Sequence, residues 1–214
     1  MIAHVNGIDI NYEIIGSGKP LVLLHGNGED HHTFDELALV MKESYQVILI
    51  DSRCHGMSEK NVEITFDLMA MDVISLLDYL NIKDVTLLGF SDGGIVGLKI
   101  ATMKEYLLNR LILCGVNFHP KGVKKEFYKQ LKGWYKKNKS PLIKLMMKEP
   151  KFKIKDLKRI SVDTTIIVGE HDLIDIRHTY KLHQYIYDSS LYVLNDENHE
   201  SYVMHQTKLK DFIL

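Results

Sequence analysis

One short segment, Gly89-Phe90-Ser91-Asp92-Gly93, limits the folds open to this chain more than any other stretch. The apolar run at residues 85–90 predicts a buried strand, and the apolar spacing of residues 95–103 predicts a helix directly after it. The chain must therefore turn from strand to helix almost at once. The two glycines lie two residues on either side of Ser91, where a Cβ would collide with the neighbouring backbone of so sharp a turn.

Ser91 itself is expected to be strained, with its hydroxyl lifted clear of the sheet at the start of the helix. The helix dipole at this end favours a developing negative charge. A catalytic serine fits this position. A glycine-rich strand-to-helix loop with an incidental serine fits the same five residues, so the rest of the chain has to decide between the two interpretations.

Strands and helices alternate along the chain, which predicts an α/β fold. A hairpin with an Asn-Gly turn is expected at residues 5–14. Further strands are expected at 21–24, 46–50, 85–90, 110–114, 164–168 and 191–194. Helices are expected at 32–41, 66–79, 95–103, 174–186 and 202–212. Strands so rich in Val, Ile and Leu indicate a mostly parallel eight-stranded sheet with helices on both faces.

Polar loops follow the carboxyl ends of these strands. They occupy residues 25–28, 51–58, 89–93 and 169–175, and a further loop carries His199. Ligands of such sheets bind beyond the carboxyl ends of the strands. We therefore expect these loops to meet at one rim, where they would form a single site.

The net charge of −1 hides a strong asymmetry. Residues 119–159 hold 15 basic and 3 acidic residues, a local charge of +12, and the rest of the chain carries −13. Apolar residues at helical spacing in this stretch predict two short amphipathic helices. We interpret residues 117–159 as a basic helical cap inserted into a single domain, 1–214. A solvated lysine face explains the charge most simply, and steering of an anionic substrate or contact with a membrane surface are alternatives.

Composition narrows the classes of partner. The chain has no apolar run of about 18 residues and no signal-peptide pattern, so no stable membrane insertion is expected. Cys54 and Cys114 are too few for a disulfide framework, which favours the cytoplasm. His31 and His32 are adjacent and lack an H-E-x-x-H pattern, so no metal is expected. We also expect no cofactor and no nucleic-acid partner, and a monomer or homodimer.

A serine needs a base, and the base needs a group that holds its tautomer. His199, in a polar loop after the last strand, is the best candidate for the base. Asp172, in a loop after the preceding strand, is the best candidate for the acid, with Asp175, Asp196 and Glu197 as alternatives. The order Ser, Asp, His is the one expected on a sheet of this kind.

Acyl transfer also requires donors for the negative oxygen of the tetrahedral intermediate. The backbone amide of Asp92, directly after Ser91, is one expected donor. The amide of Asn27 is the other, because the glycines beside it let the backbone approach the reacting oxygen. We expect His25 to brace this loop rather than to act as a base.

These segments together resemble the α/β-hydrolase fold superfamily over the whole chain. The resemblance is carried by His25-Gly26-Asn27-Gly28, by residues 51–58 (D-S-R-C-H-G-M-S), by Gly89-Phe90-Ser91-Asp92-Gly93-Gly94, by Gly169-Glu170-His171-Asp172 and by Asn198-His199. The serine segment is similar to that of valacyclovir hydrolase-like (biphenyl hydrolase-like) esterases. The chain departs from the pattern in having Cys54 where glycine is usual, no proline after Asp172, and a short cap.

The resemblance implies Ser91 as nucleophile, Asp172 as acid, His199 as base, and the amides of Asn27 and Asp92 as oxyanion donors. The predicted function is a serine hydrolase that cleaves small carboxylic esters, with Asp92 and Trp134 expected to contact substrate. An Asp92 carboxylate beside the nucleophile would favour an amino group, although a role within the turn itself is the preferred interpretation. Peptidase, lactonase or carbon–carbon bond hydrolase chemistry, or a ligand-binding signalling module with slow hydrolysis, uses the same residues.

Overall fold

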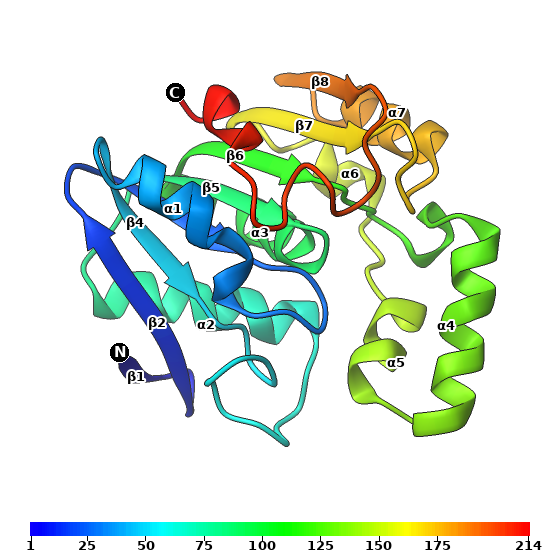
Figure 1. Ribbon diagram of the computed structural model, residues 1–214, viewed down its shortest axis with the longest axis horizontal. Helices are drawn as coiled ribbons and strands as arrows, with labels where there is room; N and C mark the ends of the chain where they lie inside the picture. Colours follow the sequence, from blue (N-terminus) through cyan, green and yellow to red (C-terminus); the bar gives the residue numbers. More distant parts are fainter.

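A single eight-stranded sheet runs through the computed structural model, which describes residues 1–214 (Figure 1). Its strands are β1 (Ile2–Val5), β2 (Ile8–Gly16), β3 (Lys19–Leu24), β4 (Tyr45–Ile50), β5 (Val85–Phe90), β6 (Leu108–Cys114), β7 (Asp163–Gly169) and β8 (Ser189–Leu194). Their order across the sheet is β1-β2-β4-β3-β5-β6-β7-β8. β2 pairs antiparallel with both β1 and β4, and every other pair is parallel. The predicted mostly parallel sheet with a leading hairpin is confirmed.

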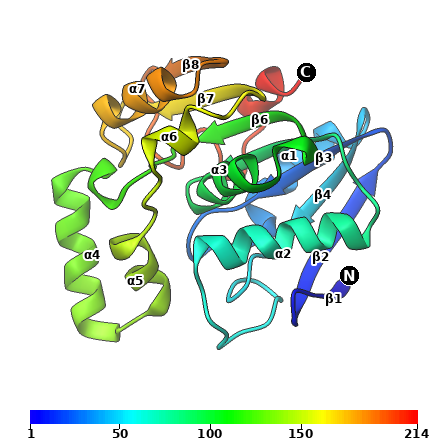
Figure 2. The same cartoon turned by 180° about the vertical axis from the view of Figure 1, so that it is seen from behind.

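Successive residues of the central strands enter two separate cores, because strand side chains alternate between the faces of a sheet. Leu87 belongs to the larger core and Leu88 to the smaller one. The larger core is covered by α2 (Phe66–Tyr79), α3 (Asp92–Lys104), α6 (Ile154–Leu157) and α7 (Ile176–Tyr185). The smaller core is covered by α1 (Asp35–Met41) and the C-terminal segment (Figures 1 and 2).

The helices begin where side chains can cap them. The Thr65 side chain accepts a hydrogen bond from the backbone amide of Leu68 and starts α2 at the predicted residue. Asp30 caps a 3-10 turn, His31–Phe34, which leads into α1, so the predicted helix at 32–41 is a short 3-10 turn followed by seven α-helical residues.

The insertion between β6 and β7 forms the expected cap. It contains a 3-10 turn, η3 (Pro120–Gly122), and two helices, α4 (Lys125–Asn138) and α5 (Pro141–Lys148), beside the carboxyl ends of the strands (Figure 1). The third helix of the insertion, α6, packs between α3 and α7 instead, and its Leu157 is buried in the larger core. α2 and α4 are the longest helices at 14 residues each, and no helix combines the length and apolar character needed to cross a membrane.

The predicted closing helix at 202–212 is wrong. Residues 201–205 form turns, and only a 3-10 helix, η4 (Lys208–Phe212), follows. His205 has a φ of 51°, in the left-handed region where an α-helix cannot continue, and its amide donates to the carbonyl of Thr33. Tyr202 and Val203 are both fully buried in the smaller core, so packing against the sheet overrides the helical spacing of the sequence.

Candidate active site

The turn between β5 and α3 has the strained geometry that its glycines predict. Ser91 has φ 50° and ψ −114°, and its amide donates to the carbonyl of Cys114 at 2.8 Å. A Cβ at Gly89 would run into the backbone of Gly93 and Gly94, and one at Gly93 would run into the carbonyls at the end of β3. Glycine is therefore required at both positions for the backbone to turn this sharply.

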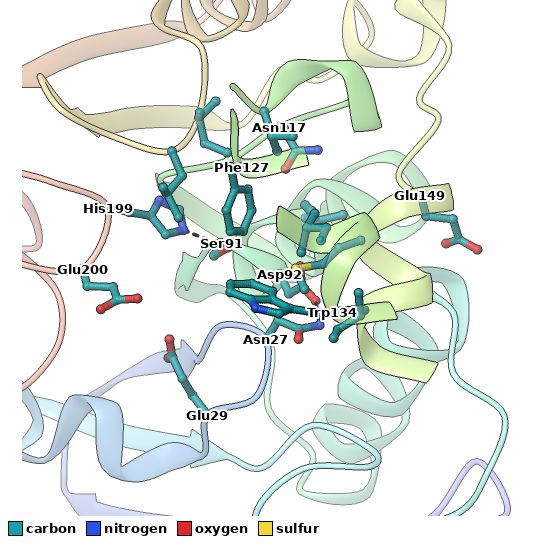
Figure 3. A pocket seen from close by; sticks show the side chains of 17 residues that line it. Asn27, Glu29, Ser91, Asp92, Asn117, Phe127, Trp134, Glu149, His199 and Glu200 are labelled. Atoms are coloured by element: carbon teal, nitrogen blue, oxygen red, sulfur yellow. Dashed lines mark hydrogen bonds between the residues drawn. The ribbon is translucent and has the colours of Figure 1, made fainter. Parts of the chain in front are cut away.

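Ser91, His199 and Asp172 form one continuous chain of hydrogen bonds. His199 Nε2 lies 3.1 Å from Ser91 Oγ (Figure 3), and His199 Nδ1 lies 2.7 Å from Asp172 Oδ1. Asp172 is almost fully buried at 1% exposure, and its Oδ1 also accepts the amide of Ile174 at 2.8 Å. When Nδ1–H donates this hydrogen bond to Asp172, His199 presents its unprotonated Nε2 to the serine hydroxyl, as a general base must.

The three alternative acids are engaged elsewhere. Asp175 caps α7 and pairs with Arg177, and Glu197 pairs with Lys208. Asp196 is exposed, and its amide donates to Glu170. Of the four candidate carboxylates, the structure therefore brings only Asp172 to His199.

Gly115, directly after β6, was not singled out from the sequence. It has a φ of 61°, and a Cβ there would come within 2.8 Å of His199 Cε1, 2.9 Å of His199 Nδ1 and 3.3 Å of Asp172 Oδ2. Any side chain at Gly115 would thus push into the His199–Asp172 contact. The sequence did contain a signal for this residue: Gly115 directly follows the strand that neighbours the Ser91 strand.

The two expected oxyanion donors both border the pocket at Ser91. The backbone amide of Asn27 donates no hydrogen bond within the protein. Asp92 is the first residue of α3, where an amide has no partner inside the helix. His25 braces the loop as expected, since its Nδ1 bonds the Gly26 carbonyl at 2.7 Å and its Nε2 accepts the Ser52 amide at 3.1 Å. Burial lowers the pKa of His25 to about 4 and keeps it neutral.

The carboxylate of Asp92 is tied to the same loop. It accepts a hydrogen bond of 2.8 Å from the side-chain amide of Asn27 (Figure 3). The same amide also reaches the carbonyl of Leu142 in α5 at 3.4 Å. Burial raises the pKa of Asp92 to about 7, and the bond from Asn27 acts in the opposite direction. The preferred interpretation of Asp92, as part of the turn, agrees with this contact.

A pocket of about 280 Å³ lies next to Ser91 and is bounded on one side by the cap. Its apolar wall includes Phe127, Leu131 and Trp134 from α4 and Ile143 and Met146 from α5. Trp134 remains 46% exposed at the edge of the pocket, edge-to-face with Phe127 (Figure 3). The amphipathic helices therefore turn their apolar faces toward Ser91.

Four carboxylates line this pocket, and no Lys or Arg does. Besides Asp92 they are Glu29, Glu149 and Glu200 (Figure 3), none of which the sequence singled out. Burial raises the pKa of Glu29, whose carboxylate accepts the Gly26 amide and the Thr33 hydroxyl. The positive charge of the cap thus does not extend into the pocket.

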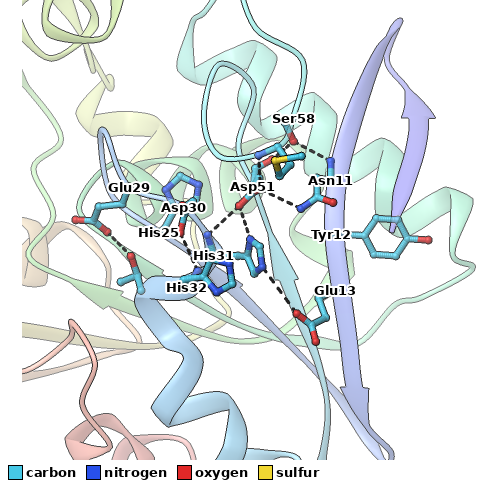
Figure 4. A network of polar contacts seen from close by, with 12 residues as sticks. Asn11, Tyr12, Glu13, His25, Glu29, Asp30, His31, His32, Asp51 and Ser58 are labelled. Atoms are coloured by element: carbon cyan, nitrogen blue, oxygen red, sulfur yellow. Dashed lines mark hydrogen bonds and ion pairs between the residues drawn. The ribbon is translucent and has the colours of Figure 1, made fainter.

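A buried network around Asp51 holds the loop after β4 (Figure 4). Asp51 accepts hydrogen bonds from the amide and ring of His31, from the Asn11 side chain and from the Met57 amide. Burial alone would raise the pKa of Asp51, but the bonds from Met57 and His31 outweigh it and lower the pKa to about 2. Cys54 in this loop has a φ of 65°, which explains why glycine suits that position.

Two groups of side chains have the spacing to hold a metal ion, and both lie outside the pocket. One comprises Asp30, His31 and His32; the other comprises Glu170, His171 and Asp196. In the first, both histidines already bond carboxylates through Nδ1, His31 to Asp51 and His32 to Asp35. Neither group contains a residue that lines the pocket at Ser91.

Comparison with known proteins identifies the family of this chain. The family described as alpha/beta hydrolase fold matches residues 19–141. An sn-1-specific diacylglycerol lipase ABHD11 of Xenopus laevis is 34% identical over 118 residues, which are 53% of this chain and 38% of that protein. A putative esterase/lipase of Haemophilus influenzae is 33% identical over 100 residues, which are 47% of this chain and 35% of that protein. The matches thus span less than two fifths of these relatives.

The fold extends beyond the matched half of the sequence. The crystal structure of a bromoperoxidase from Bacillus anthracis superposes with a TM-score of 0.85 at 22% identity, covering 100% of this chain and 97% of that one. With the family match over residues 19–141 and the order of strands and loops described above, the chain belongs to the α/β-hydrolase fold family.

Proposed function

We propose that this protein is a serine hydrolase that cleaves small carboxylic esters through an acyl-enzyme. The observation that carries the proposal is the unbroken hydrogen-bond chain from Ser91 through His199 to Asp172, at a strained turn beside a pocket. A serine hydroxyl becomes a useful nucleophile only with such a base in contact. The names of the lipase and esterase relatives are consistent with ester chemistry.

In the first half-reaction, Ser91 Oγ attacks the ester carbonyl carbon while its proton moves to His199 Nε2. The carbonyl oxygen becomes negative and accepts hydrogen bonds from the amides of Asn27 and Asp92, each worth about 2.7–4 kcal/mol at such a site. His199 then gives the proton to the departing alcohol oxygen. Asp172 stabilises the charged imidazole and does not itself take the proton.

In the second half-reaction, water replaces the alcohol. His199 removes a proton from the water as it attacks the acyl carbon, and the same amides hold the negative oxygen. Collapse of this intermediate breaks the bond to Ser91 Oγ, which recovers its proton from His199. The product is a carboxylic acid, and the enzyme is regenerated without any further reactant.

The pocket favours small substrates without a negative charge. Its volume of about 280 Å³ lies at the lower end of ordinary ligand sites. The carboxylates of Glu29, Glu149 and Glu200 would repel an anionic acyl group, which weakens the alternative that the basic cap attracts one. Asp92 serves as a substrate contact through its position beside Ser91, and Trp134 through its place at the pocket edge.

The experiment is hydrolysis of p-nitrophenyl esters of increasing chain length by the native protein and by Ser91→Ala and His199→Ala. Each substitution should lower kcat by about 10⁶-fold, the loss typical of removing a triad nucleophile or base. Ser52→Ala serves as the matched control, since this loop serine is outside the pocket. Circular dichroism checks that all variants are folded.

Activity that survives Ser91→Ala would refute the mechanism. A single burst of p-nitrophenol without turnover would keep Ser91 as the acylated group but would favour the signalling module over the esterase. A maximal rate with acetate or butyrate esters would agree with the pocket volume, whereas a preference for long chains would contradict it.

A further inference from the structure

A second hollow lies on the cap, apart from the Ser91 pocket. It has a volume of about 530 Å³ and is bordered by η3, the first turn of α4 and the C-terminal end of α5. Nine residues line it, among them His119, Val123 and Tyr128. Nothing in the proposed hydrolysis uses this hollow.

Its lining is strongly cationic. Four of the nine residues are lysines, Lys121, Lys125, Lys148 and Lys151, and none is an acid. None of the four ammonium groups has a salt-bridge or hydrogen-bond partner in the protein, although other lysines do, such as Lys99 with Asp67. Four lysines without a bonded partner therefore border one concave surface, and two of them, Lys148 and Lys151, also border a separate groove lined by Asp67 and Glu149.

Two neutral donors accompany the lysines. His119 Nδ1 accepts the amide of Lys121 at 3.1 Å, so the proton of the neutral ring is on Nε2, which has no partner. Burial, together with the charges of Lys121 and Lys151, lowers the pKa of His119. The hydroxyl of Tyr128 also has no hydrogen-bond partner. The hollow thus offers donors and positive charge but few acceptors.

We propose that this cap hollow, lined by Lys121, Lys125, Lys148 and Lys151, binds a phosphate-bearing anion. Lysine ammonium groups bind phosphate oxygens as point charges. The volume exceeds what one inorganic phosphate fills and falls within the range of small-molecule sites, so a diphosphate or a phosphate attached to an organic group fits best.

The cap hollow shares a wall with the Ser91 pocket and is connected by hydrogen bonds to the loop that carries Asp172. Val123 lines both cavities, so it forms part of the wall between them. The segment around it pairs with the loop that carries Asp172: the Lys124 amide donates to the Leu173 carbonyl and the Asp175 amide to the Gly122 carbonyl, each at 2.8 Å. An anion bridging α4 and α5 would therefore connect α5 to a segment that is itself bonded to the loop beside the triad.

The test measures binding directly and does not depend on hydrolysis. Isothermal titration calorimetry of the native chain with pyrophosphate, and co-sedimentation with vesicles containing phosphatidic acid, distinguish a soluble from a lipid source of the phosphate. The double variant Lys121→Gln/Lys148→Gln should weaken binding about tenfold or more, since it removes two charge-assisted contacts. Lys136→Gln/Lys137→Gln, on an exposed part of α4, removes the same charge and should change Kd less than about twofold.

Binding of pyrophosphate that depends on the hollow supports a soluble ligand, and binding to vesicles alone that depends on it supports a lipid phosphate. Absence of binding to both probes at millimolar phosphate would overturn the proposal. Equal weakening by the two double variants would also overturn it, because attraction would then follow overall charge rather than this hollow. Neither result bears on whether Ser91 hydrolyses esters.

Discussion

The body and the cap of this protein differ in how much of each is buried and in the sign of their charge. In the body, nine of the thirteen residues of α3 are buried, whereas α4 of the cap buries only Leu131 among fourteen. The body carries −13 and residues 119–159 carry +12. The body is therefore held by a dense apolar core, while the cap rests on one edge with its lysines in solvent.

The proposed catalytic groups belong to the body, whereas the cap shapes the pocket that would select the substrate. All three members of the proposed triad and both proposed oxyanion amides come from the body, at or just after the carboxyl ends of its strands. The cap contributes the apolar wall of the pocket but no triad member or oxyanion donor. Substitutions in the body should therefore act on kcat or stability, and substitutions in the cap on the choice of substrate.

With Ser91 and His199 left in place, the largest expected effect is on kcat, at Asp172. Asp172→Asn keeps the size of the side chain but favours the wrong tautomer of His199, and kcat should fall by about 10⁴-fold. Asp175→Asn is the control, because asparagine still caps α7 and the residue does not contact His199. Ester hydrolysis and circular dichroism measure both. Equal losses from the two substitutions would contradict the assignment of the acid.

The second effect is on stability, within the body. Arg53 and Asp72 form a buried pair with two hydrogen bonds of 2.6 Å. Asp72→Ala leaves the guanidinium buried without its partner and should lower the free energy of unfolding by about 3–5 kcal/mol. Asp67, also on α2, pairs with Lys99 at a side-chain exposure of 66%, so Asp67→Ala should cost about 1 kcal/mol or less.

Urea denaturation measures both variants. If Asp72→Ala lowered the free energy of unfolding only slightly, the body would tolerate a broken buried pair. The contrast between a densely packed body and a loosely held cap would then be weaker. Sequence reasoning did not find this pair, because its members lie nineteen positions apart and only the folded loop after β4 brings them together.

The parts that sequence did predict share a physical cause. Strands buried on both faces must be apolar throughout, so β3, β4 and β5 were visible as runs of Val, Ile and Leu. The loops at their carboxyl ends then meet because the strands are parallel. Ser91, Asp172 and His199 could therefore be placed together before any distance was known.

The parts that sequence missed depend on contacts between distant segments. Gly115 matters because its missing side chain leaves room for His199, which approaches from another loop. Glu29, Glu149 and Glu200 look like ordinary surface acids until the cap and the loops enclose one pocket. Likewise, the apolar spacing of 202–212 could not reveal that the segment would lie against the sheet instead of forming a helix.

A third effect is the dependence of stability on pH at Asp92. The pKa of Asp92 is about 7 in the folded protein and close to its ordinary 3.8 when unfolded. The folded state therefore binds one more proton between these values, and stability falls as pH rises from about 4 to about 7, by at most about 1.4 kcal/mol per unit. Asp92→Asn removes this dependence and can still accept the bond from Asn27.

Urea denaturation from pH 4 to 8 compares this variant with the native protein. The stability of Asp92→Asn relative to the native protein should increase across that range and become constant above about pH 7. Other titrating groups, such as His25, are common to both proteins and cancel in the difference. If the difference in stability between the two proteins did not change with pH, ionisation of the Asp92 carboxyl would not lower the stability of the folded protein.

The smallest effect is expected in the cap, at Trp134. Trp134→Ala removes part of the apolar wall, a side chain that is already 46% exposed. KM for butyrate esters should therefore rise severalfold, which corresponds to about 1 kcal/mol of binding free energy, while kcat for acetate esters stays unchanged. Tyr135→Ala removes the neighbouring aromatic ring, which does not line the pocket, and should leave both constants alone. If Trp134→Ala instead lowered kcat for every ester, the cap would have to position the reacting atoms as well, and the division between a body that reacts and a cap that selects would fail.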